Sequence, residues 1–70
     1  MNKNQIAFRL KENRERIGKS QSEIAEYLGV TQAVVSYYEN GTRIPSDEIK
    51  IKYAELFKKS VNMLFYSSKE

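Results

Sequence analysis

Apolar residues recur every three or four positions along most of the chain, which is the spacing of helices with one buried face. In the first such stretch, Ile6, Leu10 and Ile17 mark the inner stripe of a helix predicted to run from about residue 3 to residue 17. Asn13 falls on the same stripe, where an apolar residue is expected. The pattern therefore predicts an N-terminal helix whose inner face includes one polar side chain.

A second helix is predicted over residues 21–28 by its start signal and its apolar face. Ser20 is followed three residues later by Glu23, which is the capping-box pattern of a helix N-terminus. At about 100° per residue, three apolar residues share one face: Ile24, Ala25 and Leu28. This face is expected to pack against the N-terminal helix.

A third helix, residues 32–40, is predicted after the turn 29–31, with Thr31 as its N-cap. Val35 and Tyr38 supply its apolar stripe. The opposite face has no Lys or Glu and offers an amide, a methyl, a hydroxyl and a phenol, from Gln32, Ala33, Ser36 and Tyr37. These groups suit the edges of DNA bases, because an amide pairs with adenine and a methyl packs on the thymine methyl.

The remaining signals predict two more helices and the points where helices end. Three glycines each follow a helix-like stretch, where a left-handed residue is expected: Gly18, Gly29 and Gly41. A fourth helix is predicted after Ser46, with an inner face of Ile49 or Ile51, Tyr53, Ala54 and Phe57. A short fifth helix is predicted at about 61–65, capped by Ser60. We therefore expect an all-α, compact five-helix bundle that forms a single domain over residues 1–66, with a frayed tail at 67–70.

Several side chains of the fourth helix and its surroundings are expected at the surface. Four lysines are predicted to form a solvated face: Lys50, Lys52, Lys58 and Lys59. Tyr27 and Tyr53 are predicted to be half-buried, with their hydroxyl groups in water.

The composition narrows the chemistry of the chain. Its 70 residues suffice for one small domain, and it contains no cysteine and no histidine, so the commonest nucleophile, general base and metal ligands are missing. We expect no enzyme, no cofactor, no metal and no small-molecule ligand. The net charge of +3 permits nucleic-acid binding without showing it, because nine acidic residues accompany twelve basic ones. No apolar stretch is long enough for a signal peptide or a membrane span, so we expect a cytoplasmic protein.

The segment from Ser20 to Pro45 resembles the helix-turn-helix of the phage-repressor, Cro and XRE-type transcriptional regulators. The resemblance extends from about Leu10 to Phe65. Its matching elements are Ser20-Gln21, Ile24-Ala25, Leu28-Gly29-Val30, Val35-Ser36, Glu39-Asn40-Gly41 and Pro45-Ser46. Asn13 and Lys19 depart from the pattern because apolar residues are usual there, and Lys58-Lys59 replaces a turn that often has glycine followed by valine.

The resemblance implies a role for individual residues. The base-reading positions are Gln32, Ala33, Ser36 and Tyr37, with Gln32 as the main reader. Contacts with the DNA backbone are implied for Gln21, Thr31, Asn40 and Arg43. Arg14 and Glu39 match a pair that forms an internal salt bridge. Because Tyr37 is bulky for its position, stacking on a sugar or contact with a phosphate is an alternative to reading a base.

The resemblance also implies a sequence-specific transcriptional regulator, a repressor, that inserts its third helix into the major groove of double-stranded DNA as a homodimer on a two-fold operator. The C-terminal end is more apolar than closing a small bundle needs, so Met63, Phe65 and Tyr66 are the predicted dimer surface. The alternative is an antitoxin-like or other protein-interaction module that binds DNA only together with a protein partner.

Overall fold

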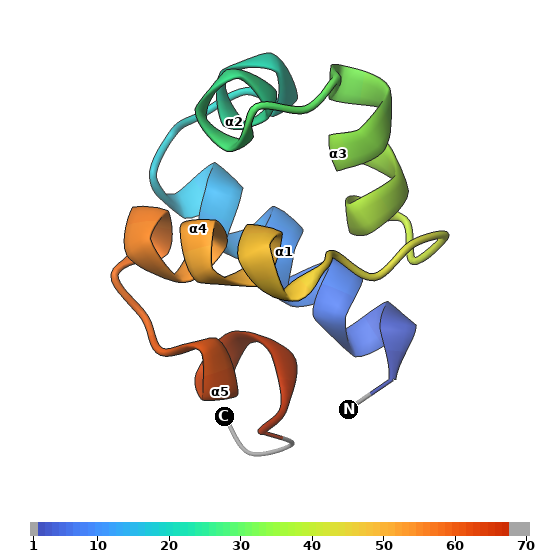
Figure 1. Cartoon of the computed structure of the whole chain (residues 1–70), viewed down its shortest axis with the longest axis vertical. Coiled ribbons are helices and arrows are strands. Elements are labelled where there is room, and N and C mark those ends of the chain that lie inside the picture. Colours follow the sequence, from blue (N-terminus) through green and yellow to red (C-terminus); the bar gives the residue numbers. More distant parts are fainter. Residues whose placement is uncertain (1, 68–70) are drawn as a thin grey trace.

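Five helices make up the part of the chain that the computed structural model describes, residues 2–67, and no strand occurs there. They are α1 (Lys3–Arg16), α2 (Gln21–Leu28), α3 (Gln32–Glu39), α4 (Asp47–Phe57) and α5 (Val61–Phe65) (Figure 1). The predicted all-α fold of five helices is confirmed. None of these helices is long and apolar enough to cross a membrane. Of the predicted tail, 68–70 lies outside the described residues, and the Ser67 N–H donates to the Asn62 carbonyl at 2.7 Å.

The helices begin where the sequence places polar capping residues. Ser20, Thr31, Ser46 and Ser60 each accept a hydrogen bond from a backbone N–H in the first turn, as predicted. The capping box of α2 is present, and the hydrogen bond from the Ser20 backbone N–H holds the pKa of Glu23 below its usual range. A second capping box, formed by Asn2 and Gln5, lies at the start of α1 and was not predicted from the sequence.

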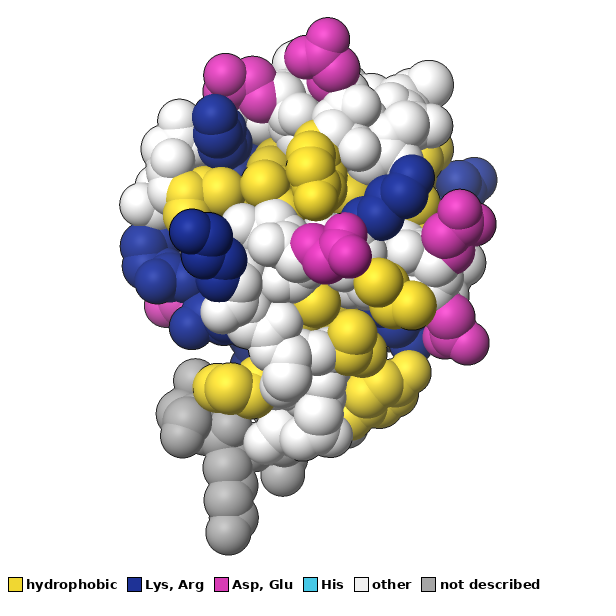
Figure 2. Space-filling view, turned by 60° about the vertical axis from the view of Figure 1, so that its left-hand side comes forward, with side chains coloured by type: hydrophobic (Ala, Val, Ile, Leu, Met, Phe, Trp, Pro, Cys, Tyr) yellow, Lys and Arg dark blue, Asp and Glu magenta, His cyan; other side chains and the backbone are white. Residues whose placement is uncertain are grey.

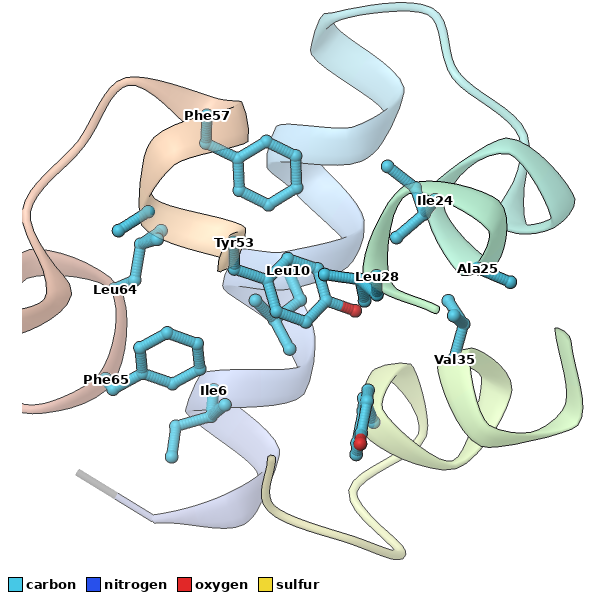
Figure 3. Packing of buried hydrophobic residues seen from close by; sticks show 12 residues of the cluster. Ile6, Leu10, Ile24, Ala25, Leu28, Val35, Tyr53, Phe57, Leu64 and Phe65 are labelled. Atoms are coloured by element: carbon cyan, nitrogen blue, oxygen red, sulfur yellow. The ribbon is translucent and has the colours of Figure 1, made fainter. Parts of the chain in front are cut away.

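The core lies where all five helices meet. Figure 3 shows Tyr53 of α4 at its centre, with Phe57 and Phe65 on one side and Leu28 on the other. The ring centroids of Phe57 and Phe65 lie 5.5 and 6.2 Å from that of Tyr53. The core consists of Ile6, Leu10, Ile24, Ala25, Leu28, Val35, Tyr38, Tyr53, Ala54, Phe57, Leu64 and Phe65. All five helices therefore contribute side chains to one core.

Some predicted inner positions differ in the structure. Ile17 is exposed, because α1 ends at Arg16 and Ile17 is its C-cap. Of the two alternatives on α4, Ile49 packs against the core and Ile51 is exposed. Asn13 is buried on the inner stripe as its position predicts. Its amide donates to the Arg9 carbonyl at 2.8 Å and its Oδ1 accepts from Arg16 at 2.5 Å, so its polar groups are satisfied.

The prediction that Lys50 is solvated is wrong. Its side chain is only 11% exposed, and its ammonium donates to the Tyr66 hydroxyl at 2.9 Å. The ammonium also lies 4.7 Å from the centroid of the Tyr66 ring and 5.6 Å from that of Phe65. These aromatic rings cover the lysine because α5 folds back over α4, which helical periodicity within α4 alone cannot reveal. Lys52 also has a structural contact, since its ammonium donates to the Leu28 carbonyl at the end of α2 at 3.3 Å.

Tyr53 is fully buried, which corrects the prediction of a half-buried residue with its hydroxyl in water. Among the described residues its hydroxyl has no hydrogen-bond partner, and burial raises the pKa of the phenol. We therefore expect Tyr53→Phe to raise the free energy of unfolding by about 1 kcal/mol, because it removes an unsatisfied polar atom and keeps the ring. Urea unfolding would measure this, with Tyr27→Phe at the surface as the control. A loss of stability would instead mean that the hydroxyl makes a hydrogen bond.

Lys58 ends α4 in a left-handed conformation, with φ 56° and ψ 44°. This conformation costs a residue with a Cβ atom about 1 kcal/mol relative to glycine. Lys58→Gly should therefore raise the free energy of unfolding by about 0.5–1 kcal/mol in thermal or urea unfolding. Lys59→Gly is the matched control, because Lys59 does not have a positive φ. It should leave stability unchanged or lower it, and an equal gain in both variants would contradict the argument.

Candidate DNA-binding surface

The packing of α3 decides which of its side chains face outward. Val35 and Tyr38 are buried against the core, as predicted. α2 and α3 pack against each other across a short turn, which Gly29 begins in a left-handed conformation with φ 77°. α3 lies at one edge of the molecule, away from α5 (Figure 1). The predicted outward face is therefore present: Gln32, Ala33 and Tyr37 are exposed and Ser36 is half-buried.

A chain of side-chain hydrogen bonds holds Gln32 at the N-terminal end of α3. Its amide nitrogen donates to Gln21 Oε1 at 3.4 Å, and its Oε1 accepts from the Ser22 hydroxyl at 3.3 Å. Gln21 Nε2 in turn donates to Glu39 Oε1 at 3.1 Å. The structure thus brings Gln21 and Gln32 together. Ser22 was not predicted as part of the site, although its position on the first turn of α2, beside Gln21, could have suggested it.

The predicted ion pair between α1 and the end of α3 is confirmed. Arg14 Nε lies 2.6 Å from Glu39 Oε2, and Arg14 NH2 lies 3.1 Å from Glu39 Oε1, so the contact is bidentate. The side chains are 12% and 3% exposed. The hydrogen bonds to Glu39 raise the pKa of Arg14 above its ordinary value. A third bond, from Arg14 NH1 to the Lys19 carbonyl at 2.8 Å, ties the same guanidinium to the segment before α2.

The remaining predicted backbone contacts lie at the two ends of α3. Thr31 is exposed at the N-terminal end, and its hydroxyl caps the helix by accepting from Val34 N–H at 3.3 Å. Asn40 is the C-cap, and its Oδ1 accepts from the Thr42 N–H at 2.9 Å. Arg43 is exposed in the following loop, with its guanidinium carbon 5.0 Å from the centroid of the Tyr37 ring. The sequence did not predict this contact between Tyr37 and Arg43.

The predicted dimer surface needs one correction. Phe65 is only 2% exposed and packs beside Tyr53 in the core, so it is unavailable for a contact between molecules. Met63 and Tyr66 are exposed to 48% and 54%. The structure therefore supports two of the three residues as surface residues.

The surface has other exposed apolar side chains besides Met63 and Tyr66. Figure 2 shows hydrophobic side chains in separate patches on one face, with Lys and Arg on both sides, mostly on the left, and acidic residues at the top, near the centre and on the right. The large exposed residues elsewhere on the molecule include Phe8, Tyr27, Ile44 and Ile51. Exposure alone therefore does not single out one contact surface.

No group of three potential metal ligands occurs within residues 2–67.

A pair of short helices joined by a tight turn, with the second helix presenting a polar outer face, defines a helix-turn-helix. Comparison with known proteins agrees: a family model described as helix-turn-helix matches residues 10–64. The chain belongs to this family of DNA-binding transcriptional regulators, of the Cro/C1 and XRE type. The family and the fold are those of DNA-binding proteins, not enzymes.

Individual relatives support the same assignment. The chain is 43% identical over 49 residues to an HTH-type transcriptional regulatory protein of Pyrococcus furiosus, covering 70% of this chain and 16% of that protein. It is 32% identical over 62 residues to the HTH-type transcriptional regulator YgzD of Bacillus subtilis, covering 89% of this chain and 94% of that one.

Two solved structures have the same fold. The N-terminal DNA-binding domain of SinR from Bacillus subtilis superposes with a TM-score of 0.82 at 31% identity, covering 96% of this chain and 99% of the other. The restriction-modification controller protein C.AhdI from Aeromonas hydrophila superposes with a TM-score of 0.80 at 29% identity, covering 89% and 94%. The predicted fold class thus agrees with known DNA-binding domains.

Proposed function

We propose that this chain is a sequence-specific repressor that binds a two-fold operator as a homodimer, at the nucleoid in the cytoplasm. The observation that carries the proposal is the outward face of α3, where Gln32 is exposed and held by Gln21 and Ser22. A glutamine amide ordered in this way can donate to adenine N7 and accept from adenine N6 in the major groove. Residues 1–66 act as one DNA-binding domain in this proposal.

Residues on the outer face of α3 read the bases, and residues around its two ends bind the DNA backbone. Gln32 is the main base reader, and Ala33 and Ser36 reach the neighbouring base edges, since N-terminal residues of a recognition helix contact the bases. Gln21, Thr31, Asn40 and Arg43 bind phosphates and set the register of α3 in the groove. Gln21 suits this role because it lies at the N-terminus of α2, where the helix dipole favours an anion.

A single domain makes few base contacts, so two copies on a two-fold site increase specificity. The two α3 helices would then lie about 34 Å apart, one turn of DNA. We place the contact between copies at Met63 and Tyr66, two exposed apolar side chains only three residues apart in the apolar C-terminal end of the chain. Repression would follow from occupation of the operator.

Selection from random duplex DNA at near-physiological salt tests this function. Enrichment of an inverted repeat with half-sites about one turn apart would support a sequence-specific dimer and identify the operator. Weak, salt-sensitive binding without enrichment would contradict it, and would favour a module that binds DNA only with a protein partner.

Sedimentation with and without the selected duplex tests the dimer surface. Met63→Lys should shift the protein toward the monomer and weaken binding to the inverted repeat, because it places a charge at the contact. Tyr27→Lys is the matched control, because Tyr27 is 47% exposed on α2, close to the exposure of Met63. An unchanged oligomeric state in Met63→Lys would rule out this surface.

Arg43→Ala should weaken binding to all duplexes alike and reduce the slope of log K against log salt by about one unit per half-site, because each copy loses one phosphate contact. Lys11→Ala, an exposed lysine of α1, should leave the slope unchanged. Titrations at several salt concentrations would measure both slopes. A loss confined to one DNA sequence would show that Arg43 reads a base.

A further inference from the structure

We propose that Tyr37 is a positioning residue for Arg43: its ring holds the Arg43 guanidinium beyond the C-terminal end of α3 for contact with a DNA phosphate, and Tyr37 itself does not read a base. The proposal rests on the proposed function, because it concerns the same surface. It assigns different roles to two residues whose outward positions alone would make both of them simple DNA contacts.

The main chain already ties the loop that carries Arg43 to Tyr37. The Tyr37 carbonyl accepts hydrogen bonds from the N–H groups of both Thr42 and Arg43, at 3.0 and 3.2 Å. The Asn40 side chain holds the Thr42 N–H as well, at 2.9 Å. Gly41 permits this tight return because its φ is +83°, and a Cβ atom there would lie 2.9 Å from Asn4 Oδ1. The start of the Arg43 side chain is therefore in a defined place relative to Tyr37.

The side chains of Tyr37 and Arg43 are also in contact. The Arg43 guanidinium carbon lies 5.0 Å from the centroid of the Tyr37 ring, within the range of a cation–π contact, which extends to about 6 Å. Such a contact uses the face of the ring and leaves guanidinium N–H groups free to donate to a phosphate. It also restricts a long side chain before binding, so less conformational entropy is lost when the DNA arrives.

The position along α3 favours a phosphate over a base. Tyr37 lies five residues beyond Gln32, about 7.5 Å further along the helix axis, and Arg43 lies beyond the end of the helix. If Gln32 reads a base, this displacement carries the pair toward the edge of a groove about 12 Å wide, where the sugar–phosphate backbone runs. The face of the Tyr37 ring then contacts the Arg43 guanidinium instead of a base.

A double-mutant cycle on the duplex selected by the unaltered protein tests the proposal. Tyr37→Leu removes the aromatic face and keeps a smaller apolar side chain, and Arg43→Lys keeps the charge and removes the planar guanidinium. Each should weaken binding about two- to fivefold, and the double variant should bind within about twofold of the weaker single variant. Tyr37→Phe should bind like the unaltered protein, because the ring is kept.

One control variant and four outcomes decide the result. Tyr27→Leu is the control and should bind normally, because Tyr27 is an exposed tyrosine of α2 and not part of the proposed DNA-binding surface. The positioning role of Tyr37 would be overturned by a changed base preference in any Tyr37 variant, by weaker binding in Tyr37→Phe, or by additive losses in the double variant. None of these three results would overturn the proposed function. Failure of the unaltered protein to bind any selected duplex would overturn the proposed function, and this proposal with it.

The contact can also be tested without DNA. In the folded free protein, the Arg43 side-chain Nε–H signal in a ¹H–¹⁵N spectrum should show a ring-current shift that persists in Tyr37→Phe and disappears in Tyr37→Leu. The same signal, unmoved in Tyr37→Leu, would show that the guanidinium does not lie over the ring.

Discussion

Glu39→Ala is expected to lower the free energy of unfolding by about 3 kcal/mol, which is a large part of the stability of a domain of this size. The Glu39 carboxylate is nearly buried and binds Arg14 through two bonds, of 2.6 and 3.1 Å. Removing it leaves the Arg14 guanidinium without its counter-charge, in a side chain that is only 12% exposed. We place the cost at the low end of the range for buried pairs, because this residual exposure lets water reach part of the guanidinium.

Urea unfolding measures this loss, with Glu55→Ala as the control. Glu55 is an exposed acid on α4, and its replacement should change stability by less than about 0.5 kcal/mol. The double variant Arg14→Met/Glu39→Leu should recover much of the loss, because an apolar pair leaves no buried charge. A Glu39→Ala protein as stable as the unaltered one would mean that the ion pair contributes nothing net.

Gln32→Ala is expected to weaken binding to the selected operator by about 1–3 kcal/mol per half-site and to relax the preference at one base pair. The physical reason is the loss of the only long amide on the exposed face of α3. Because Gln32 is at the surface, its replacement should leave thermal stability nearly unchanged. Repeating the selection with the variant would reveal which position loses its preference.

Gln32→Glu is the matched comparison for this prediction. It has nearly the same shape, but a carboxylate cannot donate to adenine N7, so adenine should be lost from the selected site and cytosine, which offers an N4–H donor, should gain. If base preference is unchanged in both variants, the assignment of Gln32 as the reader is wrong. The same protein samples should still bind with normal salt dependence, which separates a change of specificity from a loss of folding.

Local sequence signals predicted the helices well, because each helix has its own N-cap residue and its own spacing of apolar residues. The N-caps Ser20, Thr31, Ser46 and Ser60 and the spacing of the apolar residues between them act within a few residues of chain. The same signals placed Gln32 and Tyr37 on the outer face of α3. The position of an outward face follows directly from which residues form the inner one.

Contacts between helices were harder to predict. The Arg14–Glu39 pair was correctly expected, but only because the sequence resembles a known family; the two residues are 25 positions apart. Lys50 was expected in water and is covered by Tyr66, and the contact of Arg43 with Tyr37 was not expected at all. Helical periodicity identifies the apolar side of each helix and assigns the other side to water. It gives no information about which neighbouring helix covers that other side.

The division between sequence and structure thus follows the range of the interactions. Helix starts, helix ends and the inner stripe depend on bonds and packing between residues three or four apart, so they can be read from the amino-acid order. The burial of Tyr53, the cover over Lys50 and the chain of bonds from Gln32 through Gln21 to Glu39 depend on how α1, α2, α3, α4 and α5 meet. These features arise from side chains of distant segments filling one small core and its rim, and they exist only once the helices have packed.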